Sequence, residues 1–166
     1  MRRLSAPDIP LPGGPSLPGG IHGADPLSAR ASAGTFEFEL EFEVRDYECD
    51  LQGVVNNAVY LNYLEHTRHQ YLRSHGVDFA ALHKVGCDLV MTRCEVNFKG
   101  SLRSGDRFVV LMSLGRESRL RFVFHQRVLR LPDRNVMLEA RIIGTGLIGG
   151  RPGLPDAVQA LMNKTC

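Results

Sequence analysis

The residues whose types and spacing could carry out chemistry lie in the segment DLQGVVNN, from Asp50 to Asn57. Asp50 is a lone carboxylate in an apolar setting, and a helical pattern begins at Asn57. The first N–H groups of a helix are unpaired and carry partial positive charge, so they can stabilise an oxyanion forming at a nearby carbonyl. A carboxylate beside that carbonyl can attack it or activate a water. The segment therefore has the parts of an acyl-transfer site, with Asp50 as nucleophile or base and the Asn57 backbone N–H as oxyanion donor.

The residues between these two would complete the site. Gly53 allows a sharp turn or a close approach to a ligand, and Asn56 can cap the helix. We expect Gly53, Val55 and Asn56 to contact the substrate. On chemistry alone, the simpler interpretation of Asp50 is a loop acid that helps to cap the helix. Cys49 is an alternative nucleophile, but the sequence places no histidine to activate it.

A second candidate carboxylate, Glu65, lies at the edge of the apolar face of the predicted helix. Its simpler role is an ion pair with Arg68 or His69, three and four residues later. His66 and His69 do not follow the H-E-x-x-H order of a zinc helix. We therefore expect no metal and no cofactor.

Residues 103–134 hold eight arginines against three acids. Three basic residues in predicted turns are candidates to bind anionic groups of a ligand: Lys99, Arg103 and Arg134. The strand arginines are instead expected to pair with glutamates of the first strand: Arg119, Arg121 and Arg127. Basic and aromatic residues do not interleave as in a nucleic-acid surface, so no nucleic-acid partner is expected.

The elements that must position these residues follow from periodicity. Strict alternation predicts a half-buried strand over 35–44. A short helical turn is predicted over 78–86. A long helix is predicted from Asn57 to about Ser74, and Arg68 interrupts its apolar face. That face is formed by Tyr60, Leu61, Leu64, Thr67, Tyr71 and Leu72. Four further strands are predicted over 87–98, 106–117, 119–130 and 135–148.

Short connections between the later strands imply antiparallel neighbours. The expected fold is α+β, with a five-stranded antiparallel sheet wrapped around one long helix. One helix covers only part of such a sheet, so we expect a homodimer or a homotetramer that buries the remaining apolar surface. No apolar run is long enough to span a bilayer.

The chain of 166 residues suits one domain, over 35–166, preceded by a tail. The tail, 1–34, has six prolines, six glycines and no aromatic residue, and is expected to be disordered. It lacks the apolar stretch of a secretory signal, and its three arginines against two acids suggest a transit peptide for the chloroplast. The alternatives are a tail without a targeting role and a cytoplasmic protein.

The segments RDYECD, DLQGVVNNAVYLNY, LRSGDRFVV and GGRPGLP together resemble the hotdog-fold acyl thioesterases of the 4-hydroxybenzoyl-CoA thioesterase class. The resemblance is greatest to long-chain acyl-CoA thioesterases and plant plastidial acyl-lipid and acyl-carrier-protein thioesterases. It implies the same sheet and helix, and assemblies of two or four chains. It also implies hydrolysis of an acyl thioester by Asp50, with Gly53 as motif glycine and Asn57 N–H as donor to the carbonyl. The resemblance further implies a thioester of coenzyme A or of an acyl carrier protein. Lys99, Arg103 and Arg134 would then bind the phosphates of the first or the acidic surface of the second.

The sequence departs from this family at Val54, where relatives often carry histidine, so no polar role is expected there. Two alternatives are a hotdog dehydratase and a catalytically weak module that binds acyl thioesters. Dehydratases usually rely on a histidine, and none precedes or opens the helix nearby.

Overall fold

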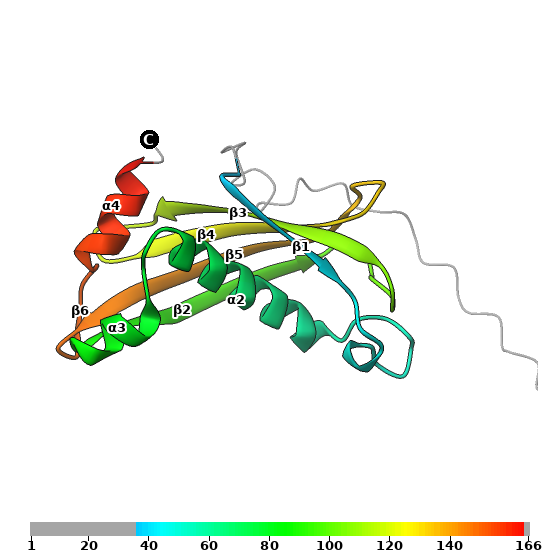
Figure 1. The fold of residues 1–166 in the computed structure, drawn as a ribbon, viewed down its shortest axis with the longest axis horizontal. Coiled ribbons are helices and arrows are strands. Elements are labelled where there is room, and N and C mark those ends of the chain that lie inside the picture. Colours follow the sequence, from blue (N-terminus) through cyan, green and yellow to red (C-terminus); the bar gives the residue numbers. More distant parts are fainter. Residues whose placement is uncertain (1–35, 165–166) are drawn as a thin grey trace, which may run out of the picture. The chain divides into compact units, whose positions relative to one another are not determined.

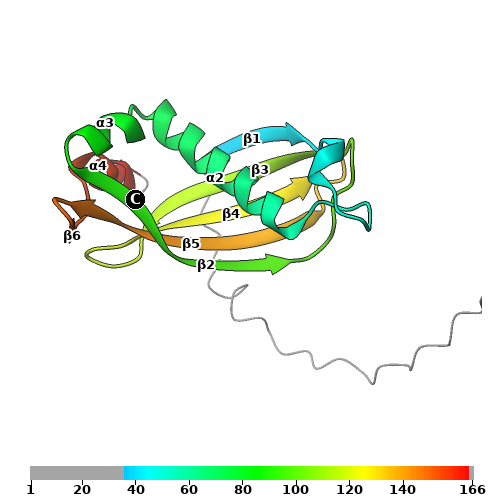
Figure 2. The same ribbon diagram turned by 90° about the horizontal axis from the view of Figure 1, so that it is seen from below.

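The computed structural model describes residues 36–164, and the predictions made for 1–34 lie outside this range. One antiparallel sheet curls around one long helix (Figures 1 and 2). The strands are β1 (Phe38–Glu43), β2 (Cys87–Phe98), β3 (Arg107–Arg116), β4 (Phe122–Arg130), β5 (Val136–Ile148) and β6 (Arg151–Pro152). The helices are η1 (Asp46–Glu48), α2 (Asn57–Ser74), α3 (Phe79–Lys84) and α4 (Asp156–Lys164).

The strand order is β1-β3-β4-β5-β2, and β6 pairs with β5. The twelve-residue β2 therefore forms one edge of the sheet, and β1 forms the other. The five long strands and the helix confirm the predicted α+β architecture. Among the described residues no helix is long and apolar enough to cross a membrane.

The first strand is shorter than its pattern predicts, and it begins at Phe38 and ends at Glu43. Phe38, Leu40 and Phe42 are partly buried while the glutamates between them are exposed, as alternation requires. Val44 follows the strand, and its side chain is buried in the core. Its N–H donates to Asp106 O at 3.0 Å, where the chain turns into the loop ahead of α2.

The bounds predicted for α2 are confirmed, but one residue of its buried face was wrong. Tyr63 is buried at 4% exposure, whereas Leu61 is 40% exposed. The reason is where the helix lies: α2 makes its closest backbone contacts with β3 and β1. The side of the helix that carries Leu61 therefore faces the less covered half of the sheet, toward β2.

The C-terminal helix α4 was not predicted. Its buried residues, Val158, Leu161 and Met162, belong to the core and follow the i, i+3, i+4 spacing of an amphipathic helix. The signal was therefore present in the sequence, in the nine residues from Asp156.

The strand arginines were predicted to pair with glutamates of the first strand, and this prediction was wrong. Arg127 pairs with Glu139 of β5 at 2.8 Å, because β3 separates β4 from β1. The β1 residue Glu41 pairs instead with Arg107 of β3. Arg119 and Arg121 lie in the turn before β4 and form no ion pair within residues 36–164.

Candidate active site

A closed turn holds the segment that contains Asp50. Asp50 N–H donates to Val54 O at 2.9 Å, and Gly53 N–H donates to Asp50 O at 3.0 Å. Gly53 has a φ of 71°, a conformation that glycine adopts without steric cost. Cys49 and Val55 form an antiparallel bridge at the base of the turn. The chain therefore enters this turn through Asp50 and leaves it directly into α2.

The Asp50 side chain is exposed and partly fixed by its own loop. Its Oδ1 accepts from Gln52 N–H at 2.8 Å. Within the described residues Oδ2 accepts no hydrogen bond, so one carboxylate oxygen is held and the other is open. The Cys49 thiol is partly buried next to it.

The start of α2 has the cap that its sequence predicts. Asn56 Oδ1 accepts from Ala58 N–H at 2.9 Å, and this confirms the capping role of Asn56. As the first helical residue, exposed Asn57 has a backbone N–H that no helical carbonyl can reach. Val55 differs from expectation: its side chain is buried in the core at 2% exposure. Any contact of Val55 with a substrate would therefore involve its backbone.

The buried carboxylate of Glu48 was not found by sequence reasoning. Its Oε2 accepts from Tyr63 O–H and from Arg45 N–H, both at 2.7 Å, and its Oε1 accepts from Arg45 Nη1 at 3.1 Å. Burial opposes ionisation of Glu48, but the hydrogen bonds from Arg45 and Tyr63 together hold its pKa below the usual value. Glu48 thereby ties the loop that carries Asp50 to the side of α2.

The loop between β2 and β3 holds the other side of the same turn. Val55 N–H donates to Leu102 O at 2.9 Å, and Leu102 N–H donates to the Tyr60 hydroxyl at 3.0 Å. Burial raises the pKa of Tyr60, so it remains a neutral acceptor. The Asp50 turn is therefore fastened both to α2 and to the sheet.

The three predicted phosphate ligands, Lys99, Arg103 and Arg134, are exposed and lie in turns at one end of the sheet. The strand register places the β2–β3 loop and the β4–β5 turn at this end. Arg134 has a φ of 54°, in the left-handed region. The Asp50 turn reaches the same end through its bond to Leu102.

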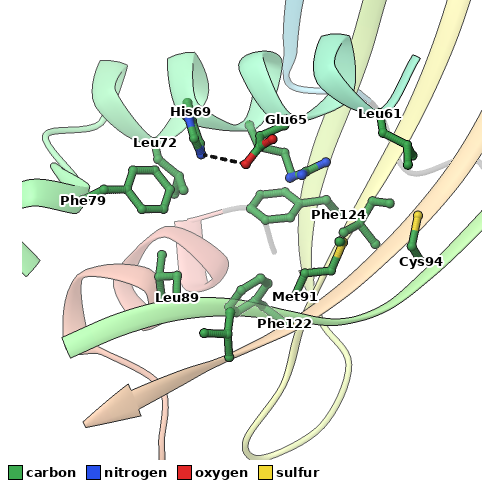
Figure 3. A pocket seen from close by; sticks show the side chains of 14 residues that line it. Leu61, Glu65, His69, Leu72, Phe79, Leu89, Met91, Cys94, Phe122 and Phe124 are labelled. Carbon is green, nitrogen blue, oxygen red and sulfur yellow. Dashed lines mark ion pairs between the residues drawn. The ribbon is translucent and has the colours of Figure 1, made fainter. Parts of the chain in front are cut away.

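A cavity of about 160 Å³ lies between α2 and the less covered half of the sheet (Figure 3). Most of its lining is apolar, including Leu61, Leu72, Phe79, Leu89, Phe122 and Phe124. Glu65 also lines it, with Oε1 3.8 Å from His69 Nε2. Glu65 and Asp50 thus belong to two different surroundings: an apolar cavity along the helix and an exposed turn before it.

Arg68, the residue that interrupts the apolar face of α2, also lines this cavity. Its Nη1 donates to Gln126 Oε1 at 3.0 Å, and Gln126 Nε2 donates to Leu64 O at 2.9 Å. Gln126 is buried at 2% exposure. Sequence reasoning missed Gln126, because it shows no signal until β4 is placed against α2.

Within residues 36–164 no group of three or more histidine, cysteine, aspartate or glutamate side chains is arranged to hold a metal ion. None of the histidines in this range precedes or opens α2.

A curled antiparallel sheet around one helix defines the hotdog fold of thioesterases, and two solved structures share it. The 1,4-dihydroxy-2-naphthoyl-CoA thioesterase from Synechocystis is similar with a TM-score of 0.72, over 76% of this chain and 95% of that one, at 19% identity. A hypothetical protein from Aquifex aeolicus has a TM-score of 0.70, over 75% of this chain and 98% of that one, at 26% identity.

Residues 44–161 match the family model of the Thioesterase-like superfamily, and the chain belongs to this family. It is 41% identical over 116 residues to a protein of Arabidopsis thaliana named acyl-acyl carrier protein thioesterase ATL2, chloroplastic. The match covers 69% of this chain and 62% of that protein, so the chain spans less than two thirds of its length.

Proposed function

We propose that the chain hydrolyses an acyl thioester of coenzyme A or of an acyl carrier protein, giving a carboxylic acid and a thiol. One observation carries the proposal: an open carboxylate, Asp50, and the uncapped N–H of Asn57 emerge from the same hydrogen-bonded turn. Membership of the Thioesterase-like superfamily supports it.

In this mechanism the thioester carbonyl oxygen accepts from the Asn57 N–H, and the helix dipole stabilises the negative charge that develops there. Asp50 Oδ2 attacks the carbonyl carbon or removes a proton from the attacking water. When Asp50 attacks, the carbon–sulfur bond breaks as a carbon–oxygen bond to Asp50 forms, and water then hydrolyses the resulting anhydride and frees Asp50. When water attacks, its oxygen forms the new carbon–oxygen bond as the carbon–sulfur bond breaks. In both routes the thiolate takes up a proton. The net reaction consumes one water.

The exposed cations Lys99, Arg103 and Arg134 would bind the carrier at the same end of the sheet. Coenzyme A offers phosphates and a carrier protein offers carboxylates, and both suit arginine and lysine. The name of the Arabidopsis relative supports a carrier protein as one substrate form.

The test measures thiol release from acyl-CoA and acyl-carrier-protein panels by wild type and by Asp50→Asn. Asparagine can keep the acceptor for Gln52 N–H while losing the carboxylate. We expect kcat to fall by about a hundredfold or more, as for loss of a nucleophile or general base. A matched control is Asp78→Asn, because Asp78 Oδ1 accepts from Ala80 N–H at 2.9 Å in the same local geometry, at the cap of α3.

Equal losses in the two variants would contradict a catalytic role for Asp50. Glu65→Gln is measured in the same assay. A larger loss of kcat in Glu65→Gln than in Asp50→Asn would indicate that Glu65, in the cavity, is the catalytic carboxylate. Thioester binding without measurable hydrolysis by wild type would instead indicate a binding module.

We also propose that the active form is a homodimer or a dimer of such dimers, and that 1–34 directs the protein to the chloroplast. The plant relative is chloroplastic by name, and the composition of the tail supports targeting. A fusion of 1–34 to a fluorescent protein should enter plastids of a photosynthetic cell; a diffuse cytosolic signal would contradict the second proposal.

A further inference from the structure

Arg68 places a charged guanidinium in a cavity whose lining is mostly apolar. Its guanidinium lines the cavity beside α2, with Cζ 6.0 Å from the ring centroid of Phe124. Within the described residues it forms no ion pair and only the one hydrogen bond to Gln126. A guanidinium has five N–H donors, so four have no protein acceptor in this part of the chain.

The guanidinium is held in place rather than left mobile. Gln126 uses its amide oxygen for Arg68 and its amide nitrogen for the α2 carbonyl of Leu64. A buried glutamine whose amide oxygen and amide nitrogen are both hydrogen-bonded fixes the position of the group it binds. The remaining donors of Arg68 are therefore presented to the cavity from a fixed position.

An acyl tail in this cavity would remove water from those donors. Charged donors left without a partner are costly, and an acceptor in the ligand removes that cost. We propose that Arg68, positioned by Gln126, is a specificity-determining residue that selects acyl chains carrying a neutral oxygen acceptor, a hydroxyl or a keto group, well along an otherwise apolar tail. This inference rests on the proposed hydrolysis and adds the class of acyl group.

A neutral oxygen fits better than a carboxylate because a negative charge is already present. Glu65 lines the same cavity (Figure 3) and precedes Arg68 by three residues on α2. Burial lowers the pKa of the Arg68 guanidinium, and Glu65 works in the opposite direction. A second carboxylate would have to approach Glu65, whereas a hydroxyl or keto oxygen adds no charge.

The position of the oxygen follows from the helix. Asn57 and Arg68 are eleven residues apart, which corresponds to about 16 Å at a rise of about 1.5 Å per residue. An extended carbon chain advances about 1.25 Å per carbon, and arginine on a helix leans toward the N-terminus. The oxygen should therefore lie on roughly the ninth to the twelfth carbon of a chain whose thioester sits at Asn57. A cavity of about 160 Å³ holds roughly six carbon atoms, since benzene fills one of about 150 Å³, so it would receive only the segment of the chain around this oxygen.

The experiment compares kcat/KM for three CoA thioesters of the same chain length: unsubstituted octadecanoyl-CoA, its mid-chain hydroxy derivative and its derivative hydroxylated next to the thioester. We expect wild type to prefer the mid-chain hydroxy substrate by about tenfold or more over the other two. Arg68→Met should lose this preference, because its kcat/KM for the unsubstituted chain should rise. Arg68→Lys keeps the positive charge but loses the planar guanidinium that Gln126 positions, so it should retain part of the preference.

Arg73→Met is the matched control, because Arg73 is an exposed arginine of the same helix; its substrate ratio should equal that of wild type. An unchanged ratio in folded Arg68→Met, with hydrolysis still dependent on Asp50, would overturn the inference and leave the proposed function intact. If no thioester is hydrolysed, calorimetric binding of the matched free acids decides. Equal affinities for the hydroxylated and plain acids would then overturn the inference as well.

Discussion

At the scale of a residue, Glu48 shows how the turn that carries Asp50 is held in place. Its carboxylate is buried and accepts three hydrogen bonds, two from Arg45 and one from Tyr63. Because those bonds lower the pKa of Glu48 in the folded protein, its contribution to stability is present above the unfolded pKa. It is lost as the pH falls through the lower, folded pKa.

Glu48→Gln should therefore destabilise the protein by about 1–3 kcal/mol at neutral pH, as hydrogen bonds to a charged group are lost. The difference from wild type should begin to shrink as the pH falls below about 4.3, the pKa of glutamate in an unfolded chain. It should continue to shrink through the lower folded pKa, below which the side chain is neutral in both proteins. Urea unfolding at several pH values measures this. Glu39→Gln, at an exposed glutamate of β1, should show neither effect. A Glu48→Gln difference that stays constant down to low pH would contradict an ionised role.

The sequence predicted the local features around Asp50 but not the contacts between residues that are far apart in the chain. Asp50, Gly53, Asn56 and Asn57 are local in sequence, so their turn and cap could be predicted from spacing alone. Tyr63 binds Glu48 from fifteen residues away, and Arg68 binds Gln126 from fifty-eight residues away, each on another element. No local pattern reports such pairs, because they form only when the helix is packed on the sheet.

At the scale of elements, periodicity located α2 and the five long strands because each is long and strongly patterned. Boundaries were less accurate at β1 and at the turn before β4. The return segment formed by β6 and α4 was missed, because β6 is short and α4 depends on packing. This segment turns back against β5, where Gly153 N–H donates to Gly146 O at 2.9 Å.

That close approach predicts the effect of a single methyl group. A Cβ at Gly146 would lie 2.7 Å from Pro155 Cδ and would also meet the Gly153 carbonyl oxygen. We expect Gly146→Ala to destabilise the protein by about 1–3 kcal/mol, through overpacking between β5 and the return segment. The control is Gly115→Ala in β3, where the added Cβ would meet Val123 Cγ1 at an ordinary 3.5 Å. Equal midpoints of urea unfolding for the two variants would contradict the packing argument.

At the scale of the whole molecule, the position of α2 leaves the sheet covered unequally. The helix lies nearest β3 and β1, and the cavity lies on the side of β2. Among the described strands β2 pairs only with β5, so its outer edge has backbone groups free to pair with another chain. Exposed apolar side chains accompany this edge, with Met91 57%, Phe98 46% and Leu61 40% exposed. A second copy would cover these side chains and one side of the cavity.

We therefore expect two chains to associate along β2 with two-fold symmetry, and the activity of each chain to fall as the dimer dissociates. Light scattering and thiol release measured over a dilution series should show both transitions at the same concentration. Phe98→Lys places a charge on the edge and should move the transitions to about tenfold higher concentration or more. Leu120→Lys, at a 40% exposed leucine in the turn before β4, should leave them unchanged. A monomer with full activity per chain would refute the shared assembly, because the cavity would then work without a partner to cover it.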